Sequence, residues 1–580
     1  MNRRRLLISL AFIICQLSLS LAQQLTVTVD SAGTLATKLP EDSRFSMSEL
    51  KVVGPLNNND FKVLRQIATR TKTKKETDAL LEELDLTEAV IVDGKGMMKS
   101  RDGRLPDGCF SGCKGLLSVA LPASIREIGR SCFSGCDGLK EMTIPDSVAT
   151  IDDNAFSGCS AMTTLQLPAT LQKIGSNAFQ GCSGLTSIDI PDNVKTIGAG
   201  AFSKCTNLER GHIAAAIGTL PNSCFEGCER LSAFNVPSTV ETIGSNAFKG
   251  CRSLEKITFP KGLKELGNSA LENCISLKSV KIENIAKVGS ETFKGCASME
   301  TATLDGVARM GSSAFEQCSS LKKVTIGGTL STLSNAAFAG CTNLTDVTLS
   351  ASIKTLGDKA FAECKSLADI SLPQSLTKIG DHVFENCTSL LKIVVPNLVK
   401  QIGHDTFEGC LSLDSVSING FIEKIESDLF RYCHSLRVVK LPPTVRTVGS
   451  NAFEQCSKLQ QITLPISVTS IGDNAFERCV SLSAVIIPPS CTTIGSSAFR
   501  ECTSMFRVEL SSALKKIGGN AFTKCTSLRD VVCSSAAPPN ISSSTFKGLP
   551  STCRFVVPRG AKNTYRQNKN WNKFTLIVEN

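Results

Sequence analysis

The sequence predicts a β-rich solenoid: a right-handed coil of about 19–20 rungs of 23 residues, with a parallel sheet along one face, short strands and 3₁₀ or helical turns elsewhere, and a cap at each end. Nineteen of the 26 cysteines recur every 23 residues, apart from two steps of 22. Phe stands three residues before the cysteine in 18 of these 19 cases, and Leu or Met stands three residues after each one. The series is Cys113, Cys136, Cys159, Cys182, Cys205, Cys228, Cys251, Cys274, Cys296, Cys318, Cys341, Cys364, Cys387, Cys410, Cys433, Cys456, Cys479, Cys502 and Cys525.

Residues 251–274, CRSLEKITFPKGLKELGNSALENC, show the pattern within one unit. Leu254, Ile257 and Phe259 have the spacing of a short strand with one buried face. Pro260 ends that strand, because proline cannot donate a ladder hydrogen bond. A second short extended segment is expected at V-x-x-I-G, where the glycine would permit a backbone turn that other residues resist. The A-F-x-G-C portion predicts a tight helical or 3₁₀ turn.

A unit of this size cannot fold by itself. Ordering its backbone costs roughly 1–2 kcal/mol per residue. Its apolar side chains return about 1.5–3 kcal/mol each only when they are fully buried. Rungs stacked in register bury these side chains between neighbours, so the physics favours a solenoid with nearest-neighbour stability.

The repeated cysteines are predicted to be buried free thiols. A disulfide needs Cβ atoms about 3.5–4.5 Å apart, whereas rungs in register hold equivalent atoms about 4.8 Å apart or more. Free cysteine is among the most buried residue types. Cys109, Cys132 and Cys224 replace the Ala before Phe, and Cys491 replaces a Val, so these four are also interpreted as small core residues.

Two further cysteines have a different setting. Cys533 and Cys553 flank the irregular stretch SSAAPPNISSSTFKGLPST. They are the one pair in the chain for which a disulfide is a candidate, as a staple for the end of the solenoid.

The N-terminal region divides into a targeting segment and a cap. Residues 1–22 have the form of a secretory signal peptide, with cleavage near Ala22. A lipoprotein with Cys15 at its new N-terminus is disfavoured, since the large residues of 12–14 precede that cysteine. Residues 23–100 are expected to form an α/β cap with a degenerate first rung. Its helix is predicted at NNNDFKVLRQIATR, from the Asn/Asp capping signals and the spacing of its apolar residues, which are Phe61, Leu64 and Ile67.

The solenoid itself is assigned to residues 101–533 and the C-terminal cap to 534–580. A last strand is expected at Phe555–Val557, and Tyr565 and Trp571 are expected to cover the final rung, with a binding role as the alternative. The two 22-residue units lack the strand-ending proline. A local change of curvature is expected there, either as a functional bend or as a tolerated deletion.

Several function classes are disfavoured by the residues. The formal net charge is +10, but the basic excess lies largely at the C-terminal end and forms no stripe typical of nucleic-acid binding. No segment after the signal peptide is long and apolar enough to span a membrane. His382 and His404 lie in adjacent rungs but 22 residues apart, and a metal site would need more converging ligands. No catalytic motif appears, so we expect neither an enzyme nor a cofactor.

The candidate site is therefore a surface. Positions five and seven residues after each repeated cysteine point outward from the strand. They carry threonines and lysines, with Val394, Ile486 and Val532 among them. One interpretation is simple β-propensity; the other is a concave protein-binding face, which extended solenoids often provide. The candidate residues are Thr143, Lys256, Thr258, Lys281, Thr303, Lys323, Thr325, Thr348, Lys392 and Thr463.

The repeated pattern L-x-x-V-x-L-P-x-S-V-x-x-I-G-x-x-A-F-x-G-C resembles the BspA-like leucine-rich repeats, over about residues 84–557. The flanks are also similar to those of exported bacterial members. The resemblance implies a surface or secreted protein, and for some members adhesion to host matrix proteins, co-aggregation or stimulation of innate receptors. A C-terminal sorting domain or anchor, which many bacterial surface proteins carry, is not recognised in the sequence.

We therefore expect an exported, non-catalytic leucine-rich repeat protein that is secreted or held at the cell surface or outer envelope. It would bind a protein partner on a host or bacterial surface, such as an extracellular-matrix protein, and no nucleic acid. The alternative is a structural or spacer protein of the cell envelope without a defined ligand. The sequence does not indicate an oligomeric state.

Overall fold

The computed structural model describes residues 24–39, 47–69, 81–95 and 100–580. The signal peptide predicted over 1–22 lies outside this range. The chain divides into two compact units, the first Met1–Leu263 with Asn273–Ile275 and the second Lys264–Glu272 with Ser276–Asn580. This division falls within the repeats, so the boundaries assigned from the sequence to the caps and the solenoid stay predictions.

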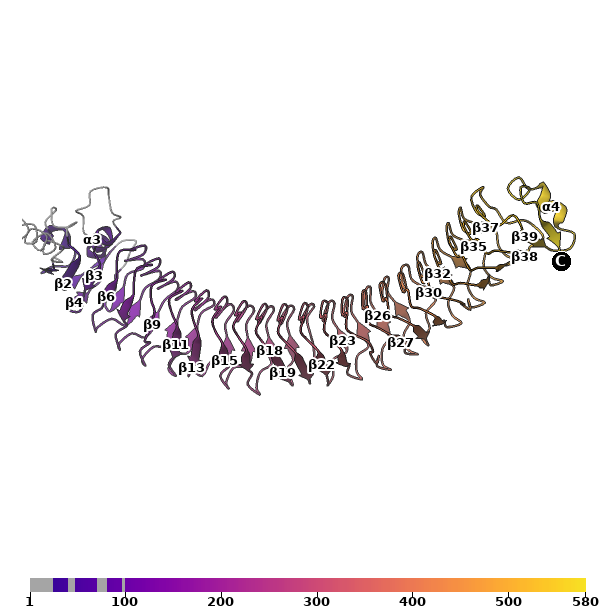
Figure 1. The fold of residues 1–580 in the computed structure, drawn as a ribbon. Coiled ribbons are helices and arrows are strands. Elements are labelled where there is room, and N and C mark those ends of the chain that lie inside the picture. Colours follow the sequence, from indigo (N-terminus) through magenta and orange to yellow (C-terminus); the bar gives the residue numbers. More distant parts are fainter. Residues whose placement is uncertain (1–23, 40–46, 70–80, 96–99) are drawn as a thin grey trace, which may run out of the picture. The chain divides into compact units, whose positions relative to one another are not determined.

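The predicted solenoid is confirmed, with stacked rungs of about 23 residues that are joined by parallel strand pairs (Figure 1). Each regular rung contributes to two rows of strands. The front row lies about five to eight residues after the repeated cysteine. The back row holds two-residue strands at the V-x-x-I-G position. Because neighbouring strands pair without a register shift, equivalent side chains stand directly above one another.

The first unit has front-row sheets on either side of one interruption. The front row consists of β1 (Gln24–Thr28), β2 (Glu49–Leu56), β3 (Glu83–Asp85), β6 (Ser118–Ala120), β8 (Glu141–Thr143), β11 (Ser187–Ile190), β13 (Arg210–Ile213), β15 (Ala233–Asn235) and β17 (Lys256–Thr258), with β4 (Ala89–Ile91) also paired to β2. The back row consists of β5 (Arg104–Leu105), β7 (Glu127–Ile128), β9 (Thr150–Ile151), β10 (Lys173–Ile174), β12 (Thr196–Ile197), β14 (Thr219–Leu220) and β16 (Thr242–Ile243).

The second unit repeats this arrangement. Its front row consists of β19 (Ser279–Glu283), β21 (Thr301–Asp305), β22 (Lys323–Ile326), β24 (Asp346–Thr348), β27 (Lys392–Val395), β29 (Ser415–Ile418), β31 (Val438–Lys440), β34 (Ala484–Ile486), β36 (Arg507–Leu510), β38 (Asp530–Cys533), β39 (Arg554–Val557) and β40 (Ile577–Glu579). Its back row consists of β18 (Glu265–Leu266), β20 (Lys287–Val288), β23 (Thr332–Leu333), β25 (Thr355–Leu356), β26 (Lys378–Ile379), β28 (Gln401–Ile402), β30 (Lys424–Ile425), β32 (Thr447–Val448), β33 (Ser470–Ile471), β35 (Thr493–Ile494) and β37 (Lys516–Ile517).

The front row is not continuous within either unit. Among the described rungs, those that follow Cys159, Cys364 and Cys456 have no front-row strand. The two 22-residue units, by contrast, contain β19 and β21, which are five residues long and pair over their whole length. Loss of the strand-ending proline therefore lengthens the strand, because the backbone N–H at that position can join the ladder.

Phenylalanine rings form the centre of each unit. Phe156 and Phe179 stack with their centroids 5.3 Å apart and their planes 2° apart, and the same contact recurs along each unit. Leu271, which takes the place of one phenylalanine, is fully buried. Every repeated cysteine is buried and free, as predicted.

The turn between the back and front rows is tighter than a helix. The Cys182 N–H donates to the Phe179 carbonyl at 3.2 Å, and the turn contains two residues with positive φ, Asn177 (54°) and Gly181 (71°). Asn and Gly tolerate this left-handed region better than other residues. The A-F-x-G-C portion is thus a hydrogen-bonded turn with two left-handed positions.

The glycine of V-x-x-I-G has a role that differs from our expectation. It was expected to permit an unusual backbone turn, but Gly198 is not among the residues with positive φ. A Cβ placed on Gly198 would lie 2.2 Å from the backbone N of Ser176 in the preceding rung. Glycine is needed here because neighbouring backbones approach too closely for a side chain.

The two ends are closed by different devices. At the N-terminus, α3 (Asn58–Ala68) begins with a capping box at Asn57 and buries Phe61, Leu64 and Ile67, as the sequence predicted. The short helix α2 (Leu35–Lys38) packs against it. At the C-terminus, which includes α4 (Lys562–Gln567), Tyr565 and Trp571 are fully buried. Burial of both rings supports the covering role and leaves neither available as a binding surface.

Candidate binding face

The front face consists of the outward positions five and seven residues after each repeated cysteine. In the second unit, Lys281, Thr303, Thr325 and Thr348 occupy one column on four consecutive rungs, because β19, β21, β22 and β24 pair in register. Lys281 and Thr348 are exposed, while Thr303 and Thr325 are half-buried. The structure therefore brings four of the predicted residues together.

The other predicted residues are distributed along both units. Thr143 lies in β8, and Lys256 and Thr258 lie in β17 of the first unit, all exposed. Lys323 and Lys392 begin β22 and β27 of the second unit. Thr463 is exposed but lies in one of the rungs that have no front-row strand.

Two of the lysines on this face are already paired. The Lys281 Nζ lies 2.6 Å from a Glu283 carboxylate oxygen, and the Lys323 Nζ lies 2.7 Å from an Asp346 oxygen. Such exposed pairs contribute little to stability. The carboxylates do offset the positive charge of these two lysines, so the front face is less basic than its lysines alone suggest.

Sequence reasoning placed Val394 and Ile486 at outward positions but missed the larger cluster of exposed apolar side chains in the second unit to which they belong. Val438 is 58% exposed, Ile486 65% and Ile466 80%. Each of six consecutive rungs, from the one after Cys387 to the one after Cys502, has at least one such residue. We call these the apolar set: Leu391, Val394, Leu398, Leu411, Phe421, Val438, Ile466, Val480, Ile486 and Phe506. Among the described rungs between Cys113 and Cys387, only Ile275 is a large apolar residue of comparable exposure.

Five members of the apolar set lie on or directly before front-row strands. Val394, Val438 and Ile486 belong to β27, β31 and β34, and Leu391 and Phe506 directly precede β27 and β36. Part of the signal was present in the sequence, because Val394, Val438 and Ile486 stand at the outward positions five or seven residues after a repeated cysteine. It is weak in any one repeat and becomes visible only when consecutive repeats are aligned.

The first unit has two adjoining hollows on its front side. The larger, of about 840 Å³, is lined by β6, β8 and the turns that follow them, and the second adds the strandless rung near Thr164 and Gln166. Both are lined by Met142, Thr143, Ile144 and Asp146. The lining mixes apolar residues such as Leu121 with hydroxylated ones such as Ser118, and it lacks a cluster of converging charges among the described residues. These hollows are shallow relief on the front face and carry no chemistry of their own.

Titratable side chains gather at the turns of the second unit. The His382 Nδ1 lies 3.0 Å from a Glu385 oxygen, and the His404 Nε2 lies 3.4 Å from a Glu426 oxygen. The His382 Nε2 also lies 3.7 Å from an Asp405 oxygen, and no group of three potential metal ligands is found among the described residues. Burial, with a hydrogen bond that protonated Glu408 donates to the Asp405 carboxylate, raises the pKa of Glu408 to about 7.

The thiols are in an environment that suppresses nucleophilic chemistry. Burial raises the pKa of the Cys182, Cys318 and Cys533 thiols to about 12. A thiolate is the reactive form, so these groups are protonated near neutral pH. Cys533 and Cys553 are both free, and Cys533 lies beside the Tyr565 hydroxyl, so the structure does not contain the disulfide suggested for this pair.

Comparison with known proteins identifies the repeats. The sequence profile described as "BspA type Leucine rich repeat region (6 copies)" matches residues 103–232, 218–345, 308–437 and 423–553. A search of curated proteins gave no match. Among the described residues, no helix has the length and apolar character that crossing a membrane requires.

Solved structures include similar leucine-rich repeat chains. A leucine-rich repeat protein from Bacteroides ovatus is 31% identical over 64% of this chain and 97% of its own, with a TM-score of 0.55. A leucine-rich cell surface protein from Faecalibacterium prausnitzii is 24% identical over 55% of this chain and 90% of its own, with a TM-score of 0.36. The stacked rungs, the cysteine and phenylalanine columns, and the profile match over most of the chain all indicate the same family. This chain belongs to the BspA-type leucine-rich repeat family.

Proposed function

We propose that this protein is exported and binds another protein on a host or bacterial surface, such as an extracellular-matrix protein, through the front face of its second unit. The apolar set carries this proposal. Large exposed apolar patches are rare on soluble proteins and mark interaction sites. Five of the ten members of the apolar set lie on or directly before front-row strands, and the fold itself does not require exposed large hydrophobic residues there, because earlier rungs form the same core without them.

The chemistry of the face suits a protein partner. Its apolar side chains stand among polar ones: Val394 is in register with Ser417, and Val438 with Ser415. Lys392 adds a positive charge at the same strand as Val394. Alternation of apolar anchors with a polar surround is typical of protein interfaces.

The binding test uses the full mature chain on immobilised matrix proteins, such as fibronectin, laminin and collagen. The double variant Val438→Glu with Ile486→Glu should reduce saturable binding at least about tenfold, since each change places a charge in a desolvated contact. The matched control is Arg446→Glu, in the same rung as Val438 but next to the back-row strand β32, and it should bind like the wild type. Equal loss in both variants would point to a general charge effect.

A spacer role in the cell envelope makes the opposite prediction. It gives no saturable partner and a protein that fractionates with the envelope regardless of substitutions in the apolar set. Labelling of intact cells with a membrane-impermeant reagent tests export separately. N-terminal sequencing of the recovered protein should begin near Gln23; a chain that keeps residues 1–22 and resists labelling would contradict export.

A further inference from the structure

Two cysteines outside the repeated series face each other across adjacent rungs near the start of the solenoid. Cys109 and Cys132 stand four residues before the repeated cysteine, where twelve of the nineteen rungs have Ala. The third cysteine at this position, Cys224, has Ala201 and Ala247 as its neighbours one rung away on either side. The chain therefore contains one adjacent pair at this position and one isolated cysteine.

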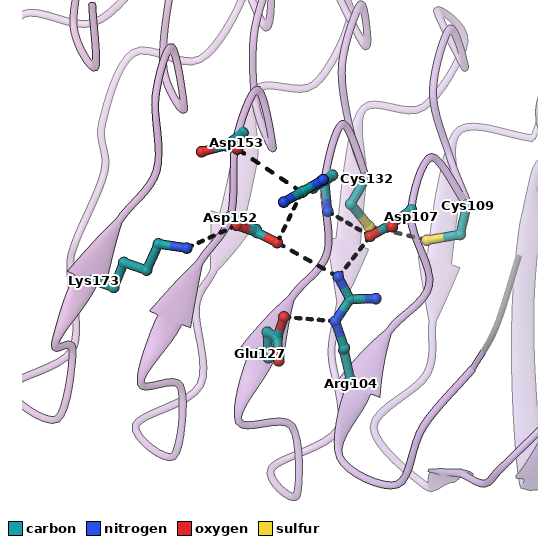
Figure 2. Close-up of polar contacts among 9 residues, drawn as sticks. Arg104, Asp107, Cys109, Glu127, Cys132, Asp152, Asp153 and Lys173 are labelled. Carbon is teal, nitrogen blue, oxygen red and sulfur yellow. Dashed lines mark hydrogen bonds and ion pairs between the residues drawn. The ribbon is translucent and has the colours of Figure 1, made fainter. Parts of the chain in front are cut away.

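The pair is much closer than stacking alone would require. The Cys109 and Cys132 Sγ atoms are 3.0 Å apart and both residues are fully buried (Figure 2). The Phe110 N–H donates to the Cys132 carbonyl at 2.8 Å, so the two backbones are held together at this point. The spacing of rungs in register argues against disulfides between equivalent cysteines in general, and these two thiols are free in the structure, but their side chains turn toward each other and bring the sulfurs within about 1 Å of the disulfide S–S distance of about 2.05 Å.

We propose that Cys109 and Cys132 form a disulfide that joins the first two regular rungs of the solenoid. The reaction is thiol–disulfide exchange with a disulfide oxidant. One cysteine thiolate attacks the oxidant's S–S bond and releases one thiol. The other cysteine then attacks the mixed disulfide and releases the second thiol, so the two cysteines lose two protons and two electrons, and the oxidant is reduced to two thiols. The inference does not depend on the partner-binding function.

The setting of the pair determines when this bond would form. Burial raises the pKa of the Cys132 thiol, and the thiolate needed for exchange is therefore scarce once the rungs have closed. The bond forms while these rungs are still open during folding and is inaccessible to reductant afterwards. It is a structural staple and not a reversible switch.

The rungs that contain Cys109 and Cys132 are also connected to their neighbours by several ion pairs. Arg104 in β5 lies 2.6 Å from Glu127 in β7 and 3.5 Å from Asp152 directly after β9, and Asp152 is also 3.0 Å from Lys173 in β10 (Figure 2). Terminal rungs of a solenoid have the fewest neighbours and open most readily. A covalent bond between these rungs would secure the end at which the N-terminal cap joins the repeats.

The direct test is mass spectrometry on the full-length protein, refolded from the reduced state in a mixture of oxidised and reduced glutathione. After blocking free thiols and digestion with trypsin, peptides 105–114 and 131–140 should appear as a linked pair, lighter by two hydrogen masses than the two free peptides. The variant Cys109→Ala, which introduces the residue common at this position, should abolish the link, and Cys224→Ala should retain it. Blocked thiols on both wild-type peptides, or a link that persists in Cys109→Ala, would overturn the proposal.

A second measurement tests the effect on the fold. When the refolded protein is reduced in denaturant and refolded without oxidant, hydrogen exchange at Phe110 and Phe133 should become at least about tenfold faster, whereas amides near Cys224 should not change. The Cys109→Ala variant should show no difference between the two preparations. Identical exchange in oxidised and reduced wild type would rule out a staple.

Discussion

The Sγ of Cys228 donates a hydrogen bond to the carbonyl of Phe202, 26 residues earlier in the chain, at 3.2 Å. The same bond recurs along both units, for example from Cys387 to Phe361. The thiol is fully buried and its carbonyl partner lies in the preceding rung. The repeated cysteine thus combines small apolar bulk with a weak donor that ties each rung to its neighbour.

Replacing this thiol should loosen the rungs locally. Cys228→Ala removes the donor and leaves a small cavity, at a cost of about 1–2 kcal/mol in the local free energy of unfolding. Native-state hydrogen exchange at the amides of the two rungs measures it. The control is Cys224→Ala in the same turn, where Ala is the usual residue, so its cost should be clearly smaller; an equal cost would show that the hydrogen bond contributes nothing.

The phenylalanine column should be sensitive to truncation. Phe361 stacks between Phe338 and Phe384, with centroids 5.6 and 5.7 Å away. Phe361→Ala should cost about 3–5 kcal/mol, because it removes a fully buried ring and leaves a cavity. Phe361→Leu copies the natural exception at Leu271 and should cost far less. Urea unfolding followed by limited proteolysis compares the two variants, and similar losses in both would refute a role for ring stacking.

Glu408 should give the second unit a pH-dependent stability. Its pKa is raised to about 7 by burial and by Asp405, with Glu385 adding to the rise and Arg431 opposing it. The folded state therefore binds more protons than the unfolded state between pH 4.5 and 7, so stability falls as the pH rises through that window.

The variant Glu408→Gln should remove this dependence. It should match the wild type near pH 5 and exceed it by about 1 kcal/mol at pH 8, a modest figure because solvent reaches the site. The measurement is urea unfolding at both pH values. Glu423→Gln serves as the control, since that side chain is 73% exposed. A constant difference between Glu408→Gln and wild type across pH would contradict the assignment.

The N-terminal cap should depend on one buried carboxylate. Asp60 accepts hydrogen bonds from the backbone N–H groups of Gly33, Leu35 and Asn57, at 2.6, 2.9 and 2.9 Å. Asp60→Ala leaves these donors unsatisfied and should cost about 2–4 kcal/mol locally. Limited proteolysis should then cut within residues 24–69 while the repeats stay intact. Asp60→Asn keeps one acceptor oxygen and should be intermediate; unchanged proteolysis in Asp60→Ala would be evidence against this role.

The fold was predictable because its signals repeat. A single period gave the rungs, the buried cysteine and phenylalanine columns, and the strand that carries Thr258 and its equivalents. The role of Gly198 was not predictable, since it depends on how closely the backbone of the preceding rung approaches. The cysteine hydrogen bond likewise joins residues 26 apart, three beyond the period, and a single repeat cannot reveal it.

The candidate site was predicted only in part. The register places Lys281, Thr303 and Thr325 in one column, with the two threonines half-buried, and a binding role for these positions stays a prediction. Val394 and Ile486 were noted singly, but the apolar set as a whole was missed because each member is an ordinary variation within its own repeat. The set is recognisable only when six consecutive rungs are compared. The exposure of each side chain depends on how the rungs stack, and the composition of the sequence does not reveal it. Cys109 and Cys132 were interpreted as separate small residues for the same reason.

The matching surfaces of the rungs make the length of this protein adjustable. Removal of residues 160–182 would join Cys159 to Ser183 and bring Phe156 against Phe202, two rings that already have the same kind of neighbour. Unequal recombination within such a gene can therefore shorten or extend the product by whole coils without redesigning its interior. The number of coils is a quantity that evolution can change in single steps, while any one coil remains free to vary its outer residues.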